Sequence, residues 1–448
     1  MSYLPADLVE EILSRVPAKS LLRLRSTCKG WNTLFKDQRF IEKHLRNVPK
    51  QLRALILEGC RLYPTSVDLN SVPPSIEFSD SLSLNESDDS EEVYIDTVFH
   101  CDGLLLCTTV EDELVVWNPC LRETRWIKQT YGTRCFYNKM FRGRKTTFAL
   151  GYEKNQFCRS YKILMFWGCD KTKGDLVDGH EIYDFNNLHD DEVDGFEIYD
   201  LNSNSWRVVK APNCFVMNSH GVSLKGNTYW VTSDDGIDDD YLLSFDFTKE
   251  RFIRLCFPLP SLDCMYKALS VVREELSVLR CIKGSSTMEM WVTNKMDTSC
   301  EADLSWSKSF AVDYGLDVYT CLLIDERKKV ALCDSYFGKG WSRVCTVGEA
   351  DEYYTEIPFK EMYLERIHIF NYVPSLVHIQ QDIESDVFDK SHRRRWDDLS
   401  REDDSDMDSG LEETDGMDSG LEEWYWWEIE GADISISRRS RGRVWKTR

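Results

Sequence analysis

The sequence lacks a positive charge balance and long apolar runs, and each absence excludes a class of protein. Its 77 acidic and 55 basic residues give a formal net charge of −22. A basic surface supplies much of the affinity for nucleic acids and anionic membranes, so we expect neither as a partner. No uncharged apolar run approaches the roughly 20 residues that span a bilayer. The N-terminal residues also lack the pattern of a signal peptide.

Closely spaced cysteines are missing as well. The 16 cysteines are scattered singly between Cys28 and Cys345, without a C-x-x-C pair, and the eight histidines never fall at ligand spacing beside them. This excludes a disulfide scaffold and a thiolate zinc site. Four cysteines lie in apolar, strand-like contexts: Cys107, Cys281, Cys321 and Cys333. We therefore expect reduced, buried thiols in a cytoplasmic and/or nuclear protein.

The motifs of common catalytic sites are absent too. The sequence contains no G-x-S-x-G, H-E-x-x-H or G-x-G-x-x-G,. Residues 190–195 approach a calcium loop, but Leu201 stands where the bidentate glutamate is required,. The acidic turn at 234–240 predicts a solvated loop, and GRKTT at 143–147 lacks the glycines of a phosphate-binding loop,. We expect no catalytic residue, no metal and no cofactor.

Residues 4–40 predict a compact set of short helices. Apolar residues from Leu8 to Val16 recur at helical spacing, and Pro17 ends this first helix,. A second apolar set follows, and basic residues interrupt it: Lys19, Arg23, Arg25 and Lys29. So small a unit carries more apolar surface than it can bury alone. Either another protein covers it or the helices pack onto the rest of the chain, although no later segment predicts a helical groove.

This stretch resembles an F-box, the motif that docks onto the Skp-type adaptor of SCF ubiquitin ligases. The matching pieces are Leu4-Pro5, Asp7-Leu8, Glu11-Ile12-Leu13, Leu21-Leu22, and Cys28-Lys29 followed by Trp31. Gly30 departs from the bulkier residue expected there, and a glycine inside a helix costs about 1 kcal/mol. The resemblance implies nine adaptor contacts: Leu4, Pro5, Leu8, Ile12, Leu13, Leu21, Leu24, Cys28 and Trp31.

From residue 52 the apolar period changes to that of strands. Residues 52–68 alternate as two short strands around a glycine, and the acidic residues 79–92 predict a loop,. Beyond residue 98 a unit recurs, with an aromatic on one strand, an Asp or Asn that opens the turn, and an aromatic on the return strand. Its copies are Trp117-Asn118 with Trp126, Tyr199-Asp200 with Trp206, and Phe245-Asp246 with Phe252.

The spacing of these units predicts a repeat. About 46 residues separate Tyr199 from Phe245, and Phe245 from Trp291,. Three or four strands in roughly 40–50 residues is the size of a β-propeller blade. About six weak repeats fit, and closing them into a ring leaves only short, protected edges. A two-sheet sandwich or several smaller sheets would be the alternative.

The β region also resembles a known family, the F-box-associated interaction domain of plant proteins. The pieces that carry the likeness are HCDGLLLC at 100–107, VVWNPCLRETRWI at 115–127, ALGYEK at 149–154, FEIYDLNSNSWR at 196–207, SHGVSLKGNTYW at 219–230 and YVPSLVHI at 372–379. Their order and spacing both match, and together with the helical motif the resemblance covers roughly residues 1–380.

Two segments stand outside this pattern. DGHEIYDFNN at 178–187 is echoed by DGFEIYDLNS at 194–203. We expect the second copy to be a strand that leads to Trp206, and the first to lie in an acidic loop at 178–193. Residues 381–448 contain MDSGLEE twice, then an aromatic cluster and a basic end, which predicts a mostly disordered tail,.

These patterns predict an α+β chain by segments: helices at 1–46, an all-β, propeller-like domain at 52–380 and an acidic, then basic tail at 381–448. The resemblance implies a non-catalytic substrate-recognition subunit of an SCF-type E3 ubiquitin ligase. Its partners would be the Skp-type adaptor, the cullin and RING subunits reached through it, and an unknown target protein. The alternatives are a protein-binding propeller that works outside a ligase, with the helices as its cap, and a propeller-type hydrolase.

Overall fold

The computed structural model describes the chain in segments. They are residues 4–48, 53–84, 93–128, 144–154, 158–169, 196–209, 215–217, 220–234, 240–255, 257, 264–282, 285–294, 304–313, 321–325, 327–337, 341–350, 354–358 and 367–379. All of them belong to one compact unit, residues 1–382, whereas the second unit, residues 383–448, lies outside the described residues.

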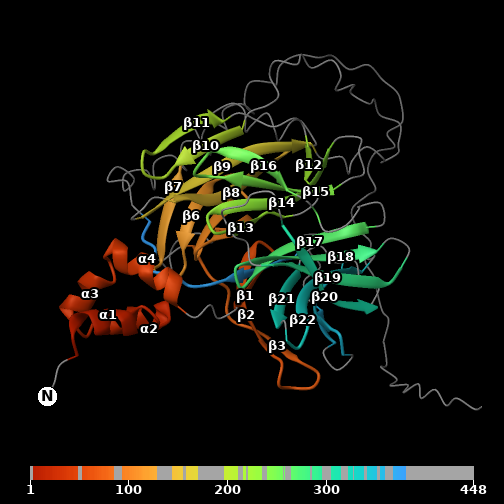
Figure 1. Cartoon of the computed structure of the whole chain (residues 1–448), viewed down its shortest axis with the longest axis horizontal. Coiled ribbons are helices and arrows are strands. Elements are labelled where there is room, and N and C mark those ends of the chain that lie inside the picture. The colour runs from red at the N-terminus through yellow and green to blue at the C-terminus, as the bar shows by residue number, and fades with distance from the viewer. Residues whose placement is uncertain are drawn as a thin grey trace, which may run out of the picture. The chain divides into compact units, whose positions relative to one another are not determined.

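Short helices open the chain, as the sequence predicts (Figure 1). They are α1 (Ala6–Leu13), α2 (Ala18–Leu24), α3 (Lys29–Leu34) and α4 (Gln38–Asn47). Pro5 and Pro17 directly precede α1 and α2, where a missing N–H costs nothing,. Asp37 caps α4, because its side chain accepts hydrogen bonds from the backbone N–H groups of Arg39 and Phe40,. We refer to residues 4–48 as the helical unit.

The strands of the described residues form six antiparallel sheets, which we number as blades in chain order. Blade 1 consists of β25 (His368–Tyr372), β1 (Arg53–Glu58), β2 (Arg61–Asp68) and β3 (Ser75–Phe78). Blade 2 consists of β4 (Ile95–Cys101), β5 (Leu104–Thr109), β6 (Leu114–Asn118) and β7 (Glu123–Ile127). Blade 3 consists of β8 (Arg144–Lys154), β9 (Arg159–Cys169), β10 (Phe196–Asp200) and β11 (Ser205–Val209).

Blades 4 to 6 complete the ring. Blade 4 consists of β12 (Phe215–Met217), β13 (Val222–Leu224), β14 (Asn227–Asp234), β15 (Asp240–Asp246) and β16 (Arg251–Leu255). Blade 5 consists of β17 (Cys264–Val272), β18 (Glu275–Ile282), β19 (Thr287–Thr293) and β20 (Trp306–Asp313). Blade 6 consists of β21 (Cys321–Asp325), β22 (Val330–Phe337), β23 (Trp341–Gly348) and β24 (Thr355–Pro358). The fold is a six-bladed β-propeller, which confirms the expected fold class.

Blade 1 closes the ring with strands from both ends of the β domain. β1 pairs with β2 around a turn at Gly59 and Cys60, as the sequence predicts, but it also pairs antiparallel with β25. Arg53 lies opposite Tyr372 and Leu57 opposite His368. This pairing places the first and last described strands of the propeller in one sheet, which closes the ring.

The aromatic units are third-to-fourth strand hairpins of their blades. Tyr199 lies directly opposite Trp206, with ring centroids 5.0 Å apart, and Phe245 opposite Phe252 at 4.8 Å. In blade 2 the return aromatic, Trp126, instead lies opposite Val115. The Asp or Asn that opens each turn accepts a backbone N–H two residues later, at 2.8–2.9 Å,.

The antiparallel blades give the propeller two faces. Turns between first and second strands and between third and fourth strands lie on one face, which includes Asp102-Gly103 and residues 119–122. Arg159 begins the second strand of blade 3 on this face, and it contacts Glu42 of α4. We call this the helix-side face. The far face carries the opposite ends of the strands, with described second-to-third turns such as Gly59-Cys60 and residues 110–113.

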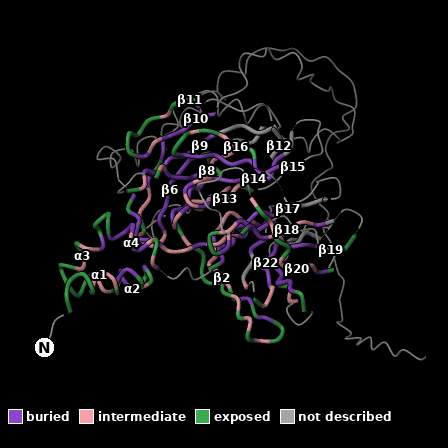
Figure 2. The backbone as a smooth tube through the Cα atoms, viewed as in Figure 1, coloured by how far each residue is buried: buried purple, intermediate pink, exposed green. Residues whose placement is uncertain are grey.

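The core runs through the blades, whose strands are largely buried in Figure 2. The cysteines expected to be buried are buried: Cys107, Cys281, Cys321 and Cys333. The second copy of the local duplication is β10, whereas the first copy, the acidic segment 85–92 and the calcium-like residues 190–195 lie outside the described residues. Within the described residues, no helix has the length and hydropathy that a bilayer crossing requires.

Candidate partner-binding surface of the helical unit

Helix α1 and the residues before it present an apolar stripe to solvent. Leu4, Leu8 and Ile12 recur every four residues, so their side chains lie along one side of the helix,. Their exposed fractions are 59%, 52% and 54%, and Pro5 is exposed beside them. Large aliphatic side chains gathered at this exposure indicate a surface for another protein. We call these three residues the α1 stripe.

The other predicted adaptor contacts divide between surface and interior. Cys28 is exposed, and Leu24 and Trp31 are half-buried against the main apolar cluster. Leu13 and Leu21, by contrast, are 5% and 0% exposed. In this structure Leu13 and Leu21 therefore belong to the core of the helical unit. The nine residues predicted from the motif do not form one continuous exposed set.

The inner side of the helical unit packs on the propeller. Phe40 and Ile41 of α4 are 1% exposed and share a buried cluster with Leu376, Val377 and Ile379 from the end of the β domain. On this side the helices therefore pack onto the rest of the chain, which is one of the two alternatives that the sequence leaves open. The cover is a non-helical segment, which helical periodicity cannot reveal. The helical unit has one side turned to the propeller and one to solvent.

A buried ion-pair network joins the two parts. Arg159 of β9 contacts Glu42 of α4 at 3.2 Å through Nε, donates its backbone N–H to Glu42 at 3.1 Å, and also pairs with Asp102. Its guanidinium lies 4.5 Å above the ring of Tyr152,. Burial alone would lower the pKa of Arg159, but the charge of Asp102 in particular raises it,. The arginine is thus charged between two carboxylates.

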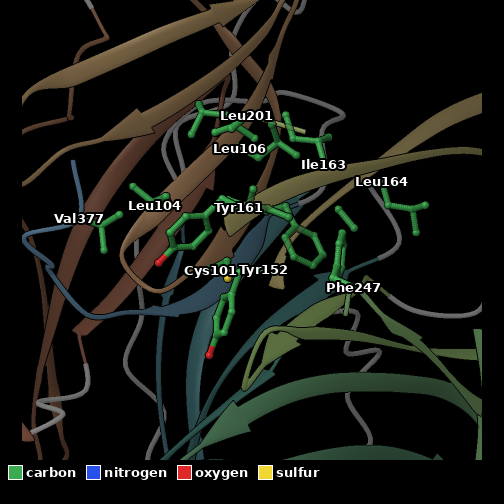
Figure 3. Packing of buried hydrophobic residues seen from close by; sticks show 14 of the residues in the cluster. Cys101, Leu104, Leu106, Tyr152, Tyr161, Ile163, Leu164, Leu201, Phe247 and Val377 are labelled. Carbon is green, nitrogen blue, oxygen red and sulfur yellow. The ribbon is translucent and has the colours of Figure 1, made fainter. Parts of the chain in front are cut away.

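Apolar and phenolic side chains surround this network. Figure 3 shows Tyr161 and Tyr152 near Cys101, with Leu104 and Val377 close by. The hydroxyl of Tyr161 donates to Asp102 at 3.3 Å. Burial raises the pKa of both the Cys101 thiol and the Tyr161 hydroxyl, so both groups are neutral,. The site is suited to holding the arginine in place and offers no activated nucleophile.

Residues 373–379, which we call the C-terminal strap, cross the helix-side face of blade 2. Asn118 donates its side-chain N–H groups to the carbonyls of Ser375 and Val377, at 3.3 and 2.7 Å. Glu123 accepts the backbone N–H of Ile379 at 2.9 Å. Gly103 has a φ of +81°, and a Cβ there would lie 2.6 Å from Ser375 Oγ. The glycine allows the strap to approach the β4–β5 turn closely.

Within the helical unit, charges tie α4 to α1. Lys43 contacts Glu10 at 2.9 Å and Glu11 at 3.1 Å, and Arg15 contacts Glu11 at 2.6 Å. Hydrogen bonds from Arg15 and Lys43 hold the pKa of Glu11 below its usual range. These contacts orient α1, and with it the α1 stripe, relative to the helix that is anchored on the propeller.

Several described segments of the chain end on the far face. The chain leaves the described residues there after Leu84, Cys169 and Asp234, and returns at Val93, Phe196 and Asp240. Tyr94 and Val110 are exposed on this face, and Glu111 and Asp112 follow Val110. No target-binding residue was predicted from the sequence. Among the described residues, no cluster of His, Cys, Asp and Glu can hold a metal.

Sequence reasoning missed the residues that join the two parts of the chain. Asn118 was predicted only to open a turn, which it does, since its Oδ1 accepts from the backbone N–H of Cys120. Its second role requires a partner 259 positions later. Arg159 and Glu42 carried no signal, because isolated charged residues on a strand and a helix usually mark solvated positions. The pattern YVPSLVHI carries part of the family likeness, but nothing in it indicates a strap.

Comparisons with known proteins divide the chain at the same place. Residues 1–43 match the F-box domain family, and residues 53–379 match the family described as F-box associated beta propeller domain. An F-box/kelch-repeat protein of Arabidopsis thaliana is 47% identical over 395 residues, which are 85% of this chain and 98% of the relative. F-box only protein 9 of the same plant is 44% identical over 395 residues, 85% of this chain and 96% of the relative.

Solved structures give a weaker likeness. TolB from Acinetobacter baumannii aligns with a TM-score of 0.36 at 10% identity, over 74% of this chain and 70% of TolB. A score this low carries no information about function.

Proposed function

The chain belongs to the family of F-box proteins that carry an F-box-associated β-propeller, and from this premise we propose that it is a substrate-recognition subunit of an SCF-type ubiquitin ligase. The observation that carries the proposal is the two-sided helical unit. Its inner side is anchored on the propeller, and its outer side leaves Leu4, Leu8 and Ile12 exposed. An apolar stripe on a small, anchored helical unit suits a stable protein partner, here the Skp-type adaptor.

In this role the protein performs no bond chemistry. The adaptor links it to the cullin and RING subunits, and the propeller holds the target protein. Binding both at once converts the encounter between a target lysine and the charged conjugating enzyme into an effectively intramolecular reaction. No catalytic group and no cofactor is required of this chain.

The target would bind on the far face of the propeller. That face is opposite the helical unit, so a bound target leaves the α1 stripe accessible to the adaptor. Second-to-third turns such as residues 110–113 lie there, and such loops commonly carry recognition,. The free thiols of the described cysteines support a cytoplasmic and/or nuclear site of action,.

Adaptor binding tests the proposal directly. We expect Leu8→Ala with Ile12→Ala to abolish co-purification with a plant Skp-type adaptor, because truncating the central anchors of an apolar interface removes most of its affinity. Both side chains are exposed, so the thermal unfolding transition should be unchanged. The matched control is Val72→Ala with Val208→Ala, two exposed aliphatic residues of the propeller. Equal adaptor recovery from both double variants would contradict the proposal.

A second candidate function, a propeller that binds proteins outside any ligase, is favoured by the shared core. Helices that cap the β domain would pack on it in the same way as α4 does. A role as a cap does not explain the α1 stripe, however, because the side chains of that stripe are exposed to solvent and lie outside the core shared with the propeller. The two functions differ in adaptor binding, which only the ligase subunit requires.

A further inference from the structure

Blade 6 contains three cysteines side by side on adjacent strands. Cys321 of β21 lies directly opposite Cys333 of β22, and Cys333 lies opposite Cys345 of β23. Residues that face each other across a ladder project to the same side of the sheet. The three side chains therefore form a row across the blade, with exposed fractions of only 1%, 0% and 1%.

The two contacts of Cys333 within this row differ in kind. Its thiol points at Cys321, with 3.1 Å between the two Sγ atoms. The thiol of Cys345 instead donates to the backbone carbonyl oxygen of Cys333, at 3.6 Å. One pair of sulfur atoms is thus in contact, and the third thiol is turned to the backbone.

The backbone of these strands also suits a bond between Cys321 and Cys333. Directly opposed residues of an antiparallel pair have Cα atoms about 4.5–5.5 Å apart. Disulfides span Cα–Cα distances of roughly 4.4–6.8 Å, so this separation lies within their range. Since the sulfur atoms are already 3.1 Å apart, small side-chain rotations bring them to bonding distance without a change in strand pairing.

We infer that Cys321 and Cys333 are a modification site, at which hydrogen peroxide forms a cross-strand disulfide within the folded blade. One sulfur attacks an oxygen of the peroxide, and the O–O bond breaks to leave a sulfenic acid and one water. The second thiol then attacks the sulfenic sulfur, the S–O bond breaks, and a second water leaves as the S–S bond forms. The two thiols together lose two electrons and two protons, and the peroxide is reduced to water.

Burial determines when this reaction occurs. Burial above all raises the pKa of the Cys333 thiol, and the hydrogen bond to Cys321 raises it further,. Because the thiolate is the reactive form, the pair should respond to sustained peroxide and not to a brief exposure. Once one sulfur is oxidised, its partner is already in contact, which favours the disulfide over further oxidation. In a reducing compartment such a bond is transient.

The site adjoins the closure of the ring. β21 and β22 both pack on β25, the strand that pairs with β1. A disulfide would join residues 12 positions apart, and such a link restricts the unfolded chain more than the folded one,. Oxidation should therefore stabilise the blade that lies beside the closure.

The test uses the full-length chain under native conditions. Exposed thiols such as Cys28 and Cys158 are first blocked with N-ethylmaleimide, and the protein is then incubated with hydrogen peroxide. The sample is unfolded in fresh N-ethylmaleimide to stop thiol exchange. Trypsin places the three cysteines of blade 6 on separate peptides, because it cleaves after Arg327 and Arg343, which lie between them. Mass spectrometry of linked peptides identifies the sulfurs that are joined, and thermal unfolding is measured before and after oxidation.

We expect the Cys321 and Cys333 peptides to be linked about tenfold more often than those of Cys333 and Cys345, and dithiothreitol should reverse the link. The wild-type melting temperature should rise on oxidation and return after reduction. Cys333→Ala should abolish both effects, whereas Cys345→Ala, the matched control for a buried cysteine of the same blade, should retain them.

The wild-type peptide map decides the inference even if a variant fails to fold. Absence of the link between Cys321 and Cys333, or its formation only in urea, would overturn the inference. An equal yield of the link between Cys333 and Cys345 would do so as well. The adaptor-binding test of the proposed function is independent of each of these results.

Discussion

Arg159 of strand β9 and Glu42 of helix α4, 117 positions apart in sequence, meet in a nearly buried ion pair between the helical unit and the propeller. The same arginine pairs with Asp102 at the β4–β5 turn. Three elements with no sequence proximity are thus held by one cation. Under the proposed function, this contact would fix the placement of the adaptor-binding surface relative to the propeller.

Arg159→Met should destabilise the fold, because it leaves two carboxylates largely buried without their cation. Breaking such a network from one side costs about 3–5 kcal/mol. Combining Arg159→Met with Glu42→Gln should recover part of the loss, since one uncompensated charge is removed. Urea unfolding of the single and double variants measures both effects. A single variant within about 0.5 kcal/mol of wild type would show that the network adds no stability.

Asn118→Ala should cost more than the equivalent change in blade 3. Asn118 opens its turn and also donates to two carbonyls of the C-terminal strap. The side chain of Asp200 accepts the backbone N–H groups of Asn202 and Ser203 in its own turn, at 2.8 and 3.3 Å. We expect a loss of about 2–3 kcal/mol for Asn118→Ala and about 1 kcal/mol for Asp200→Ala. Unfolding free energies compare the two, and equal losses would mean that the strap contacts contribute nothing.

Two glycine-to-alanine changes should alter the stability of the fold in opposite directions. At Gly103 a Cβ would meet Ser375 and Val373 at 2.6 Å in a left-handed backbone, so Gly103→Ala should cost at least 1–2 kcal/mol, on the order of a strained residue,. At Gly30, inside α3, the nearest atom would be Cys28 Sγ at an ordinary 3.6 Å. Gly30→Ala should therefore stabilise the chain by about 0.5–1 kcal/mol. Melting temperatures that shift in the same direction would refute this reasoning.

Acid should weaken the fold through His100. Its Nε2 accepts the backbone N–H of Gly103 at 3.0 Å, and burial lowers its pKa to about 4. The unfolded chain, with a histidine pKa of about 6.5, then binds more protons between pH 6.5 and 4. The contribution of His100 to the free energy of unfolding is fully present above about pH 6.5. The free energy of unfolding falls by on the order of 2 kcal/mol as the pH drops to about 5.

His100→Gln provides the comparison, because the amide oxygen can still accept from Gly103 but does not titrate. Its unfolding free energy should change less between pH 7 and 5 than that of wild type. Parallel pH curves for the two proteins would remove His100 as the cause. The measurement is a urea titration at each pH.

Leu13 and Ile12 are neighbours in the motif with opposite environments. Leu13 is 5% exposed and Ile12 is 54% exposed. We expect Leu13→Ala to cost about 2–4 kcal/mol by leaving a cavity, and Ile12→Ala to cost less than about 1 kcal/mol. Circular dichroism during urea unfolding measures both. Similar losses would mean that Ile12 is also part of the folded core.

Local signals explain how much of this fold could be predicted. Pro5, Pro17 and the helical spacing of apolar residues mark the helices, because capping and periodicity act within a few residues. The aromatic hairpins were predictable for the same reason, since Tyr199 and Trp206 are cross-strand neighbours joined by one turn. Their regular spacing then indicated blades.

The candidate site could be predicted only in part. Periodicity places Leu8, Ile12 and Leu13 on one broad apolar face, but it does not distinguish the edge that faces solvent from the edge that is buried in the core. Only packing decided that Leu13 is buried and Ile12 exposed. The charged residues at the junction could not be recognised, because an ion pair leaves no periodic trace in the sequence.

The helices, the aromatic hairpins, the motif likenesses and the acidic balance could be read from the chain alone, because each depends on near neighbours or on composition. Tertiary structure alone decided the pairing of β1 with β25, the strap against Asn118 and the arginine between Glu42 and Asp102. Those contacts depend on how the ring closes, which brings distant segments together. Ring closure also separates the α1 stripe from the face proposed to bind the target.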